Sequence, residues 1–222
     1  MQKLLESALA TLKKGQFIVL YDGDEREGEA DLIFHAKFAD AKKIERMRKD
    51  AGGLICVALS EKIGNELKLP FYTDMIANDK NLKPIIIEKA AYGDRPAFSI
   101  SVNHKDVYTG IPDNDRSLTI RKLEETIETN EPLENFRREF RTPGHVFLLI
   151  GRGLENRRGH TELSLKLAEL ADMKQVMVLC EMLGSGTALG KNEAKEYAKK
   201  NGLIFLEGKE LLQATSSQSI SR

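Results

Sequence analysis

Short apolar runs separated by helical and polar stretches constrain the fold of this chain more than any other feature of its sequence. The longest unbroken apolar run is Leu54–Leu59, whereas a membrane-spanning helix needs about 20 apolar residues. Short apolar runs bounded by turn residues are typical of strands buried inside a sheet. The strands predicted in this way are Phe17–Tyr21, Leu32–Ala36, Leu54–Leu59, Val146–Ile150, Val176–Cys180 and Leu203–Leu206.

Between these runs, apolar residues recur at the three- and four-residue spacing of amphipathic helices. Helices are predicted for residues 2–14, from Asp40 to Gly52, from Ser60 to Pro70, from Asp115 or Ser117 to Ile127, from Thr161 to Leu170, and for residues 192–200. Phe98, Ile100 and Val102 instead alternate with polar residues, which favours an antiparallel strand with one buried face. We therefore predict an α+β fold, a layered sandwich in which helices flank a mixed, largely antiparallel β-sheet.

The 222 residues contain no low-complexity linker, internal repeat or step in composition. We therefore predict a single domain over residues 1–212. The polar ending TSSQSISR predicts a disordered tail over residues 213–222. Residues 73–96 show little periodicity, and we expect them to form a long surface excursion with one strand, Pro84–Glu88.

The charge of the chain is balanced, with 34 lysines and arginines against 34 aspartates and glutamates. A neutral chain without a basic tract argues against a nucleic-acid partner, because such binding depends on neutralising phosphates. The charged N-terminal stretch lacks the apolar centre of a signal peptide, so we expect a soluble cytoplasmic protein without a membrane partner. Two cysteines, Cys56 and Cys180, are too few for a disulfide framework or a four-cysteine zinc site.

The densest polar segment is DGDEREGEAD, residues 22–31, in which many carboxylates accompany a single arginine. If this segment is extended, Glu25, Glu27, Glu29 and Asp31 share one face. Neighbouring carboxylates repel one another unless water or a cation screens them, and Mg²⁺ binds one or two carboxylates together with ligand oxygens. The segment thus suits a magnesium site. The alternative, which the segment taken alone favours, is a solvated turn between two strands.

Residues 156–162, NRRGHTE, give a second signal, because Arg157 and Arg158 closely precede a predicted helix. A helix N-terminus presents free N–H groups and the positive end of the helix dipole. Together with these arginines and the Thr161 hydroxyl it suits a phosphate group, and His160 can ligate a metal. The alternative is that Thr161 only caps the helix and the arginines are solvated. Basic residues at a helix start oppose the dipole, and a bound anion would offset this, so we favour a phosphate site.

Two further polar side chains stand at the ends of predicted strands. His145 follows a Pro-Gly turn at the start of one strand, and Glu181 comes directly after the run Val176–Cys180. A carboxylate that is half-buried at a strand end can have a raised pKa suited to proton transfer. Both side chains are therefore candidates for acid–base chemistry.

The remaining polar residues carry weaker signals. Cys56 lies inside a predicted strand, where a lone cysteine is usually part of the core, and we interpret His35 and His104 as ordinary surface or loop histidines. The sequence has no dinucleotide fingerprint, Walker loop, nucleophile elbow or C-x-x-C pair, so no organic cofactor is predicted. Taken alone, the residues predict a Mg²⁺-dependent enzyme that acts on a small phosphorylated polyol or sugar.

Several motifs in a fixed order extend this interpretation. In chain order they are D-E-R-E-G-E-A-D, G-G-L-I-C, T-G-I with D-N-D-R, R-T-P-G-H-V, R-R-G-H-T-E and C-E-M. Over Met1 to about Leu212 the chain resembles the 3,4-dihydroxy-2-butanone 4-phosphate synthases of riboflavin biosynthesis, in their archaeal single-function form. The resemblance implies that D-ribulose 5-phosphate is converted to 3,4-dihydroxy-2-butanone 4-phosphate and formate by a single catalytic domain. It also implies Mg²⁺, with Mn²⁺ as a substitute, and a homodimer whose active sites lie near the subunit interface.

The resemblance also assigns roles to individual residues. Those placed at family positions are the metal ligands Glu27 and His160; the substrate contacts Arg26, Glu27, Asp31, Thr109 and Glu181; the phosphate-binding run Arg157, Arg158, Gly159, His160 and Thr161; the catalytically essential His145 and Glu181; and the pocket positions Glu29, Cys56 and Thr109. His145, Glu181, Asp31, Cys56 and Glu29 are the candidate catalytic residues. Whether Glu181, Asp31 or Cys56 takes the first proton stays open.

Two other functions fit the same residues. One is a different metal-dependent phosphosugar lyase or isomerase, because a fold does not fix a function. The other is a non-catalytic module that binds a phosphosugar. Formate release distinguishes the synthase from both.

Overall fold

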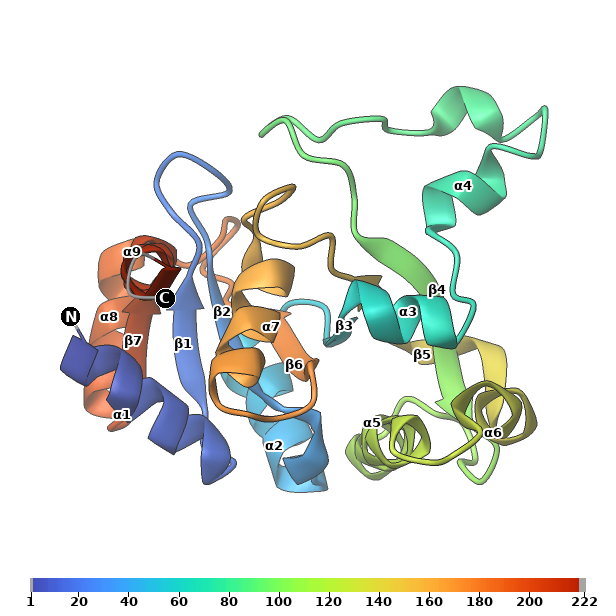
Figure 1. Cartoon of the computed structure of the whole chain (residues 1–222), viewed down its shortest axis with the longest axis horizontal. Coiled ribbons are helices and arrows are strands. Elements are labelled where there is room, and N and C mark those ends of the chain that lie inside the picture. The colour runs from blue at the N-terminus through green and yellow to red at the C-terminus, as the bar shows by residue number, and fades with distance from the viewer. Residues whose placement is uncertain (1, 220–222) are drawn as a thin grey trace.

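A mixed β-sheet forms the middle layer of the computed structural model, which describes residues 2–219 (Figure 1). In this described part the sheet has seven strands in the order β4-β5-β3-β6-β2-β1-β7. The strands are β1 (Ile18–Tyr21), β2 (Ala30–His35), β3 (Cys56–Leu59), β4 (Phe98–His104), β5 (Phe140–Ile150), β6 (Val176–Glu181) and β7 (Ile204–Glu207). The pairs β3–β5 and β1–β7 are parallel, and the other neighbouring strands are antiparallel. The predicted α+β fold with a mixed, largely antiparallel sheet is confirmed.

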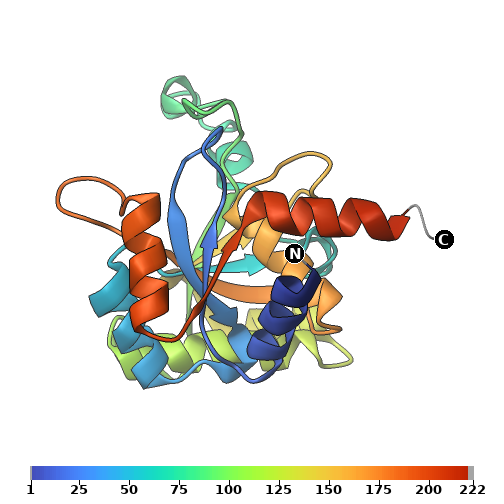
Figure 2. The same cartoon turned by 90° about the vertical axis from the view of Figure 1, so that its left-hand side faces the viewer.

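Helices cover both faces of the sheet, as the side view shows (Figure 2). One face carries α1 (Gln2–Lys13), α7 (His160–Leu170) and α9 (Gly208–Ser219). The other carries α2 (Ala41–Arg46) with its π-helical continuation Met47–Ala51, α3 (Glu61–Glu66), α5 (Asp113–Ile127), α6 (Pro132–Glu139) and α8 (Lys191–Lys200). Three short elements lie outside these layers or connect them: α4 (Tyr72–Ile76) and the 3₁₀ turns Ala36–Phe38 and Lys83–Ile85. No helix within residues 2–219 is both long and apolar enough to span a bilayer.

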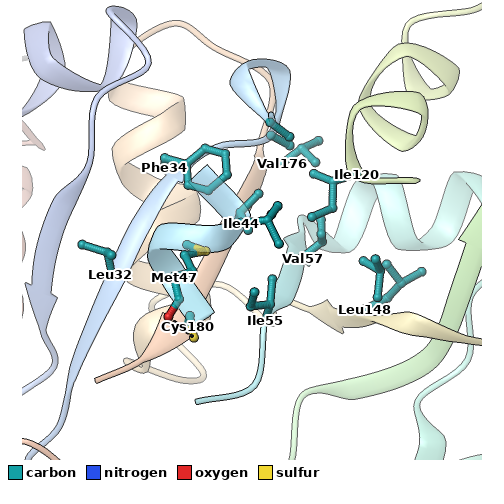
Figure 3. Packing of buried hydrophobic residues seen from close by; sticks show 14 of the residues in the cluster. Leu32, Phe34, Ile44, Met47, Ile55, Val57, Ile120, Leu148, Val176 and Cys180 are labelled. Atoms are coloured by element: carbon teal, nitrogen blue, oxygen red, sulfur yellow. Dashed lines mark hydrogen bonds between the residues drawn. The ribbon is translucent and has the colours of Figure 1, made fainter. Parts of the chain in front are cut away.

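Each face of the sheet has its own apolar core, because successive side chains of a strand point to opposite faces. On one face Phe34 packs in the same cluster as Ile44 of α2 (Figure 3). On the other face Ile33 packs in the same cluster as Leu163 of α7. Asp31 stands two residues before Ile33 in β2 and is therefore directed towards the α7 face. The alternation of side chains along β2 thus places the Asp31 carboxylate between the sheet and α7.

The surface excursion predicted for residues 73–96 projects beyond the body of the molecule and includes residues 71–96 in the structure (Figure 1). The strand predicted at Pro84–Glu88 is wrong, because this stretch has no neighbouring strand within the described residues. A 3₁₀ turn at Lys83–Ile85 satisfies part of its backbone instead, with Ile85 N donating to Leu82 O. Proline cannot donate to a sheet ladder, which disfavours a strand here.

The strand β4 departs from its predicted alternation. The register shifts between Phe98 and Ser101 and again between Val102 and Asn103, so Phe98 stays exposed while Ser99 is buried. The Ser99 hydroxyl donates to Pro70 O at 2.6 Å, which supplies its hydrogen bond in the core. A bulge of this kind re-aims side chains along a strand.

Three other expectations need correction. Both His35 and His104 are buried rather than at the surface: the ring of His35 bonds Lys174 O at 2.7 Å, and that of His104 packs edge-on against Phe140. The helix α6 was not predicted. Residues 213–219 continue the helix α9, so the tail expected from residue 213 is wrong over that stretch, and residues 220–222 lie outside the described part.

Candidate active site

A cavity of about 330 Å³ lies at the edge of the sheet where the β1–β2 loop, the start of α7 and the end of β6 meet. Predicted site residues that line it are Glu27, Glu29, Asp31, Cys56, Arg157, His160, Thr161 and Glu181. A larger cavity of about 520 Å³ lies between α1, α2 and the end of α8, and lysines and Arg46 dominate its charged lining. Chemistry rather than size therefore identifies the smaller cavity as the candidate active site.

The acidic β1–β2 loop folds around Asp22, a residue that received no role from the sequence. Its Oδ1 accepts the N–H groups of Gly23 and Glu29 at 2.8 and 3.1 Å. Its Oδ2 accepts Glu27 N at 3.2 Å and Arg26 Nη1 at 2.8 Å. These bonds engage both oxygens of the buried carboxylate and fix the position of Glu27. The segment is thus a structured loop rather than a solvated turn.

Two carboxylates meet across neighbouring strands at the floor of the cavity. Asp31 of β2 and Glu181 of β6 are directly paired in the antiparallel register, and Glu181 Oε2 accepts Leu54 N at 2.8 Å. Asp31 is 1% exposed, and its Oδ1 has no hydrogen-bond partner in the described part of the chain. Burial raises the pKa of Asp31 to about 7, although the nearby His160 ring opposes this shift. A carboxyl group with this pKa can take up and release a proton near neutral pH.

Cys56 and Glu29 lie beside these two carboxylates. Burial and the charges of Glu181 and Asp31 raise the pKa of the Cys56 thiol well above its ordinary value, so the thiol stays protonated. Burial and the charge of Glu27 also raise the pKa of Glu29.

Glu27 and His160 form the candidate metal site. Glu27 Oε2 lies 3.5 Å from His160 Nδ1, close to the roughly 3 Å that separates adjacent ligands of Mg²⁺ at bond lengths of about 2.1 Å. The ring's Nε2 lies 3.1 Å from the carbonyl oxygen of Glu29 and 3.6 Å from Asp31 Oδ1. Such a partner on the far nitrogen orients a ligating histidine. Asp22 also has a ligand atom within 4.8 Å of those of Glu27 and His160, but its oxygens are already hydrogen-bonded.

The electrostatics of this pair favour a cation. Burial alone would lower the pKa of His160, but Asp31, Glu27 and Asp22 together raise it to about 9. Burial would raise the pKa of Glu27, yet His160 and Arg26 lower it to about 2. A field that retains a proton on a buried imidazole also attracts a divalent ion, which would replace that proton. The residues present therefore fit Mg²⁺ and, by the same ligand chemistry, Mn²⁺.

Two guanidinium groups meet at the N-terminus of α7. Gly159 is the N-cap and no side chain caps the helix, so the alternative in which Thr161 serves as the cap is wrong. A Cβ atom at Gly159 would collide with the guanidiniums of Arg157 and Arg26. Arg26 Nη2 and Arg157 Nε are buried without hydrogen-bond partners among the described residues. Two unpaired donors beside a helix N-terminus suit an oxyanion such as phosphate.

Three further residues contact this cluster, and none of them has a role predicted from the sequence. Glu162, 2% exposed, pairs with Arg157 Nη1 at 2.7 Å and holds that guanidinium in place. From the excursion, the Tyr92 ring packs 4.8 Å from the Arg26 guanidinium, and Asp94 pairs with Arg26 Nε at 2.9 Å. Glu162 lies inside the R-R-G-H-T-E motif and could have been inferred there, whereas the excursion gave no sequence signal.

The structure does not bring every predicted site residue into the cavity lining. Arg26 and Gly159 lie beside Arg157 but do not line the cavity. Arg158 is exposed, and among the described residues its guanidinium donates only to Leu154 O, at 3.4 Å. Thr109 and His145 are also exposed and lie close to each other through Asn103, whose amide bonds Thr109 O and the backbone and ring of His145. His145 precedes the cavity residue Leu149 by four positions on β5, or roughly 13 Å along an extended strand.

Comparison with known proteins agrees with this arrangement. Residues 6–214 match the family described as 3,4-dihydroxy-2-butanone 4-phosphate synthase. The protein of that name from Methanosarcina acetivorans is 46% identical over 95% of this chain and 90% of its own length. The one from Methanothermobacter thermautotrophicus is 38% identical over 95% of each chain.

A solved structure shares the fold as well. A 3,4-dihydroxy-2-butanone 4-phosphate synthase in complex with two magnesium ions superimposes with a TM-score of 0.78 at 27% identity, covering 97% of both chains. The motif order, the full-length matches and the shared architecture agree, and the chain therefore belongs to the 3,4-dihydroxy-2-butanone 4-phosphate synthase family.

Proposed function

We propose that this protein converts D-ribulose 5-phosphate to 3,4-dihydroxy-2-butanone 4-phosphate and formate, and that it does so in the cytoplasm as a step of riboflavin biosynthesis. One observation supports this most strongly. One cavity is lined by a Glu–His pair fit for a divalent ion, by the buried Asp31, by the half-buried Glu181 and by Arg157. Arg26 lies beside Arg157, and each of these two guanidiniums has a donor without a hydrogen bond among the described residues. These are the groups that a phosphorylated sugar undergoing several proton transfers requires.

The guanidiniums of Arg26 and Arg157, with Thr161 at the start of α7, would bind the phosphate. The phosphate does not react, so its binding energy serves to orient the sugar in the cavity. Glu27 and His160 would hold Mg²⁺, for which Mn²⁺ is a chemical substitute, and no organic cofactor is proposed. When bound, this ion supplies Lewis-acid stabilisation of negative charge on the substrate oxygens.

The proton transfers would fall to Asp31 and Glu181. The pKa of Asp31, raised to about 7 mainly by burial, makes it the favoured base for the proton next to the ketone. Glu181 is its direct neighbour across the strands and can move a second proton during loss of the hydroxyl. The protonated thiol of Cys56 is unsuited to take the first proton, and Glu29 borders the same space as a further acid–base group.

The proposal is tested by incubating the purified protein with ribulose 5-phosphate and Mg²⁺ and measuring formate. We expect formate in step with consumption of the sugar, loss of the reaction after EDTA treatment, and recovery when Mg²⁺ is added back. Heat of saturable binding without formate would instead favour a phosphosugar-binding module. A product that retains all five carbons would favour an isomerase.

We further propose that the protein is a homodimer in which Thr109 and His145 complete the site of the partner subunit. Both side chains are exposed, and Tyr108 beside them is 98% exposed, so a large aromatic side chain at this place is available to pack against a partner. Mixing two inactive variants, His145→Ala and Glu27→Gln, should restore part of the activity, because mixed dimers would contain one intact site. Activity that stays absent in verified mixed dimers would contradict sites shared between subunits.

A further inference from the structure

One arginine, Arg152, contacts both ends of the excursion over residues 71–96. The guanidinium of Arg152 lies 3.6 Å from the centre of the Phe71 ring, and its Nη2 donates to Pro96 O at 3.4 Å. The backbone N–H of Arg152 in turn donates to Glu162 Oε1 at 3.1 Å. The two ends are thus held together beside the arginine cluster, and the stretch just before Pro96 is kept against it.

Asp94 lies between the guanidiniums of Arg26 and Arg157, and Arg157 lines the cavity. Its Oδ2 accepts Arg26 Nε at 2.9 Å and lies 3.8 Å from Arg157 Nε. A local turn holds this aspartate in position, because Ala90 N donates to Asp94 O and Gly93 N donates to Ala90 O. The carboxylate therefore stands where a bound anion would contact both arginines.

The carboxylates of this cluster already carry more negative charge than the two guanidiniums can neutralise, which disfavours an additional anion. Four carboxylates contact the two guanidiniums within 4.0 Å, namely Asp22, Glu27, Asp94 and Glu162. Asp22 and Glu162 are buried parts of the loop and of α7. Of the four, only Asp94 belongs to the excursion and can leave without unfolding the site. A phosphate dianion arriving beside Asp94 would be repelled.

The unpaired donors indicate that a larger anion fits this place better than a carboxylate does. With Asp94 in this position, Arg26 Nη2 and Arg157 Nε have no hydrogen-bond partner in the part of the chain that the structure describes. A single carboxylate oxygen cannot reach both, whereas the three free oxygens of a phosphate ester present acceptors in different directions.

From these observations we propose that Asp94 is an internal anion that occupies the phosphate subsite and that the substrate phosphate must displace it. This inference rests on the proposed function, because it takes Arg26 and Arg157 as the phosphate-binding pair. Asp94 would then set the affinity of the site, since part of the intrinsic binding energy is used to break its ion pairs.

The test is calorimetric titration of inorganic phosphate into the full chain in Mg²⁺-containing buffer. Asp94→Asn keeps the shape but removes the charge, and we expect it to bind phosphate about tenfold more tightly than the wild type. Glu88→Gln removes the same charge from an exposed residue of the same excursion and should leave the affinity unchanged. Arg157→Ala should lose the binding, which locates the titrated site.

Equal or weaker phosphate binding by Asp94→Asn would overturn the proposal, because Asp94 would then have no competing role. An equal gain in Asp94→Asn and Glu88→Gln would overturn it too, because the effect would be one of overall charge. Formate release by the wild type tests the proposed function separately. A wild type that releases formate, together with an Asp94→Asn variant of unchanged affinity, would refute only the role of Asp94.

Discussion

Replacing Glu27 with glutamine is expected to abolish formate production while the fold stays intact. The amide has the shape of the carboxylate but neither its charge nor its affinity for Mg²⁺, and the ion is expected to lie between this residue and His160. Losing Lewis-acid stabilisation of several kcal/mol corresponds to a fall in kcat on the order of 10³-fold or more. The measurement is formate release at saturating ribulose 5-phosphate.

Glu25→Gln provides the matched control for this variant. Glu25 lies in the same acidic loop, is exposed and makes no ion pair or hydrogen bond with any residue in 2–219. Its replacement removes the same charge from the loop and should leave kcat near the wild-type value. Full activity of Glu27→Gln at ordinary Mg²⁺ concentrations would refute the role of Glu27 as a metal ligand.

Asp31→Asn is expected to separate activity from stability. As the favoured base, Asp31 should contribute about 10²–10⁴-fold to kcat, the usual range for a positioned proton-transfer group. Its carboxylate is buried, and one oxygen lacks a hydrogen bond from any described residue, so a neutral amide removes an unfavourable buried charge. The variant should therefore unfold at a temperature no lower than that of the wild type.

The two readouts of Asp31→Asn are thermal unfolding and steady-state formate release on the same preparation. A collapse of kcat with unchanged unfolding temperature supports a role in proton transfer. A parallel loss of stability and activity would instead show that Asp31 supports activity by stabilising the fold. An unchanged kcat would indicate that Glu181, and not Asp31, is the base.

The sheet could be predicted from the sequence wherever apolar runs are short and both faces are buried. The predicted strand Val176–Cys180 differs from β6 by one residue at its end. A strand that is buried on both faces has an unbroken apolar sequence, which makes its bounds easy to predict. The alternation of Phe98, Ile100 and Val102 was a poorer guide, since two register shifts in β4 break the period. Bulges depend on the neighbouring strand and leave no mark in a local pattern.

The candidate site was predictable in part. The sequence placed Glu27 and His160 in separate motifs, and the resemblance to a family suggested that they share an ion, which agrees with their 3.5 Å contact. The importance of Asp94 could not be inferred, because its ion pairs join segments that are distant along the chain. The sequence also could not show that His145 lies outside the cavity lining of its own chain, because only the folded sheet fixes the distance between them.

A diffraction experiment on crystals soaked with Mn²⁺ and recorded at the manganese absorption edge tests the proposed metal site most directly. We predict an anomalous peak about 2 Å from both a carboxylate oxygen of Glu27 and Nδ1 of His160. A peak bound by other residues, with Glu27 and His160 both free of metal, would contradict the proposed site and the chemistry derived from it.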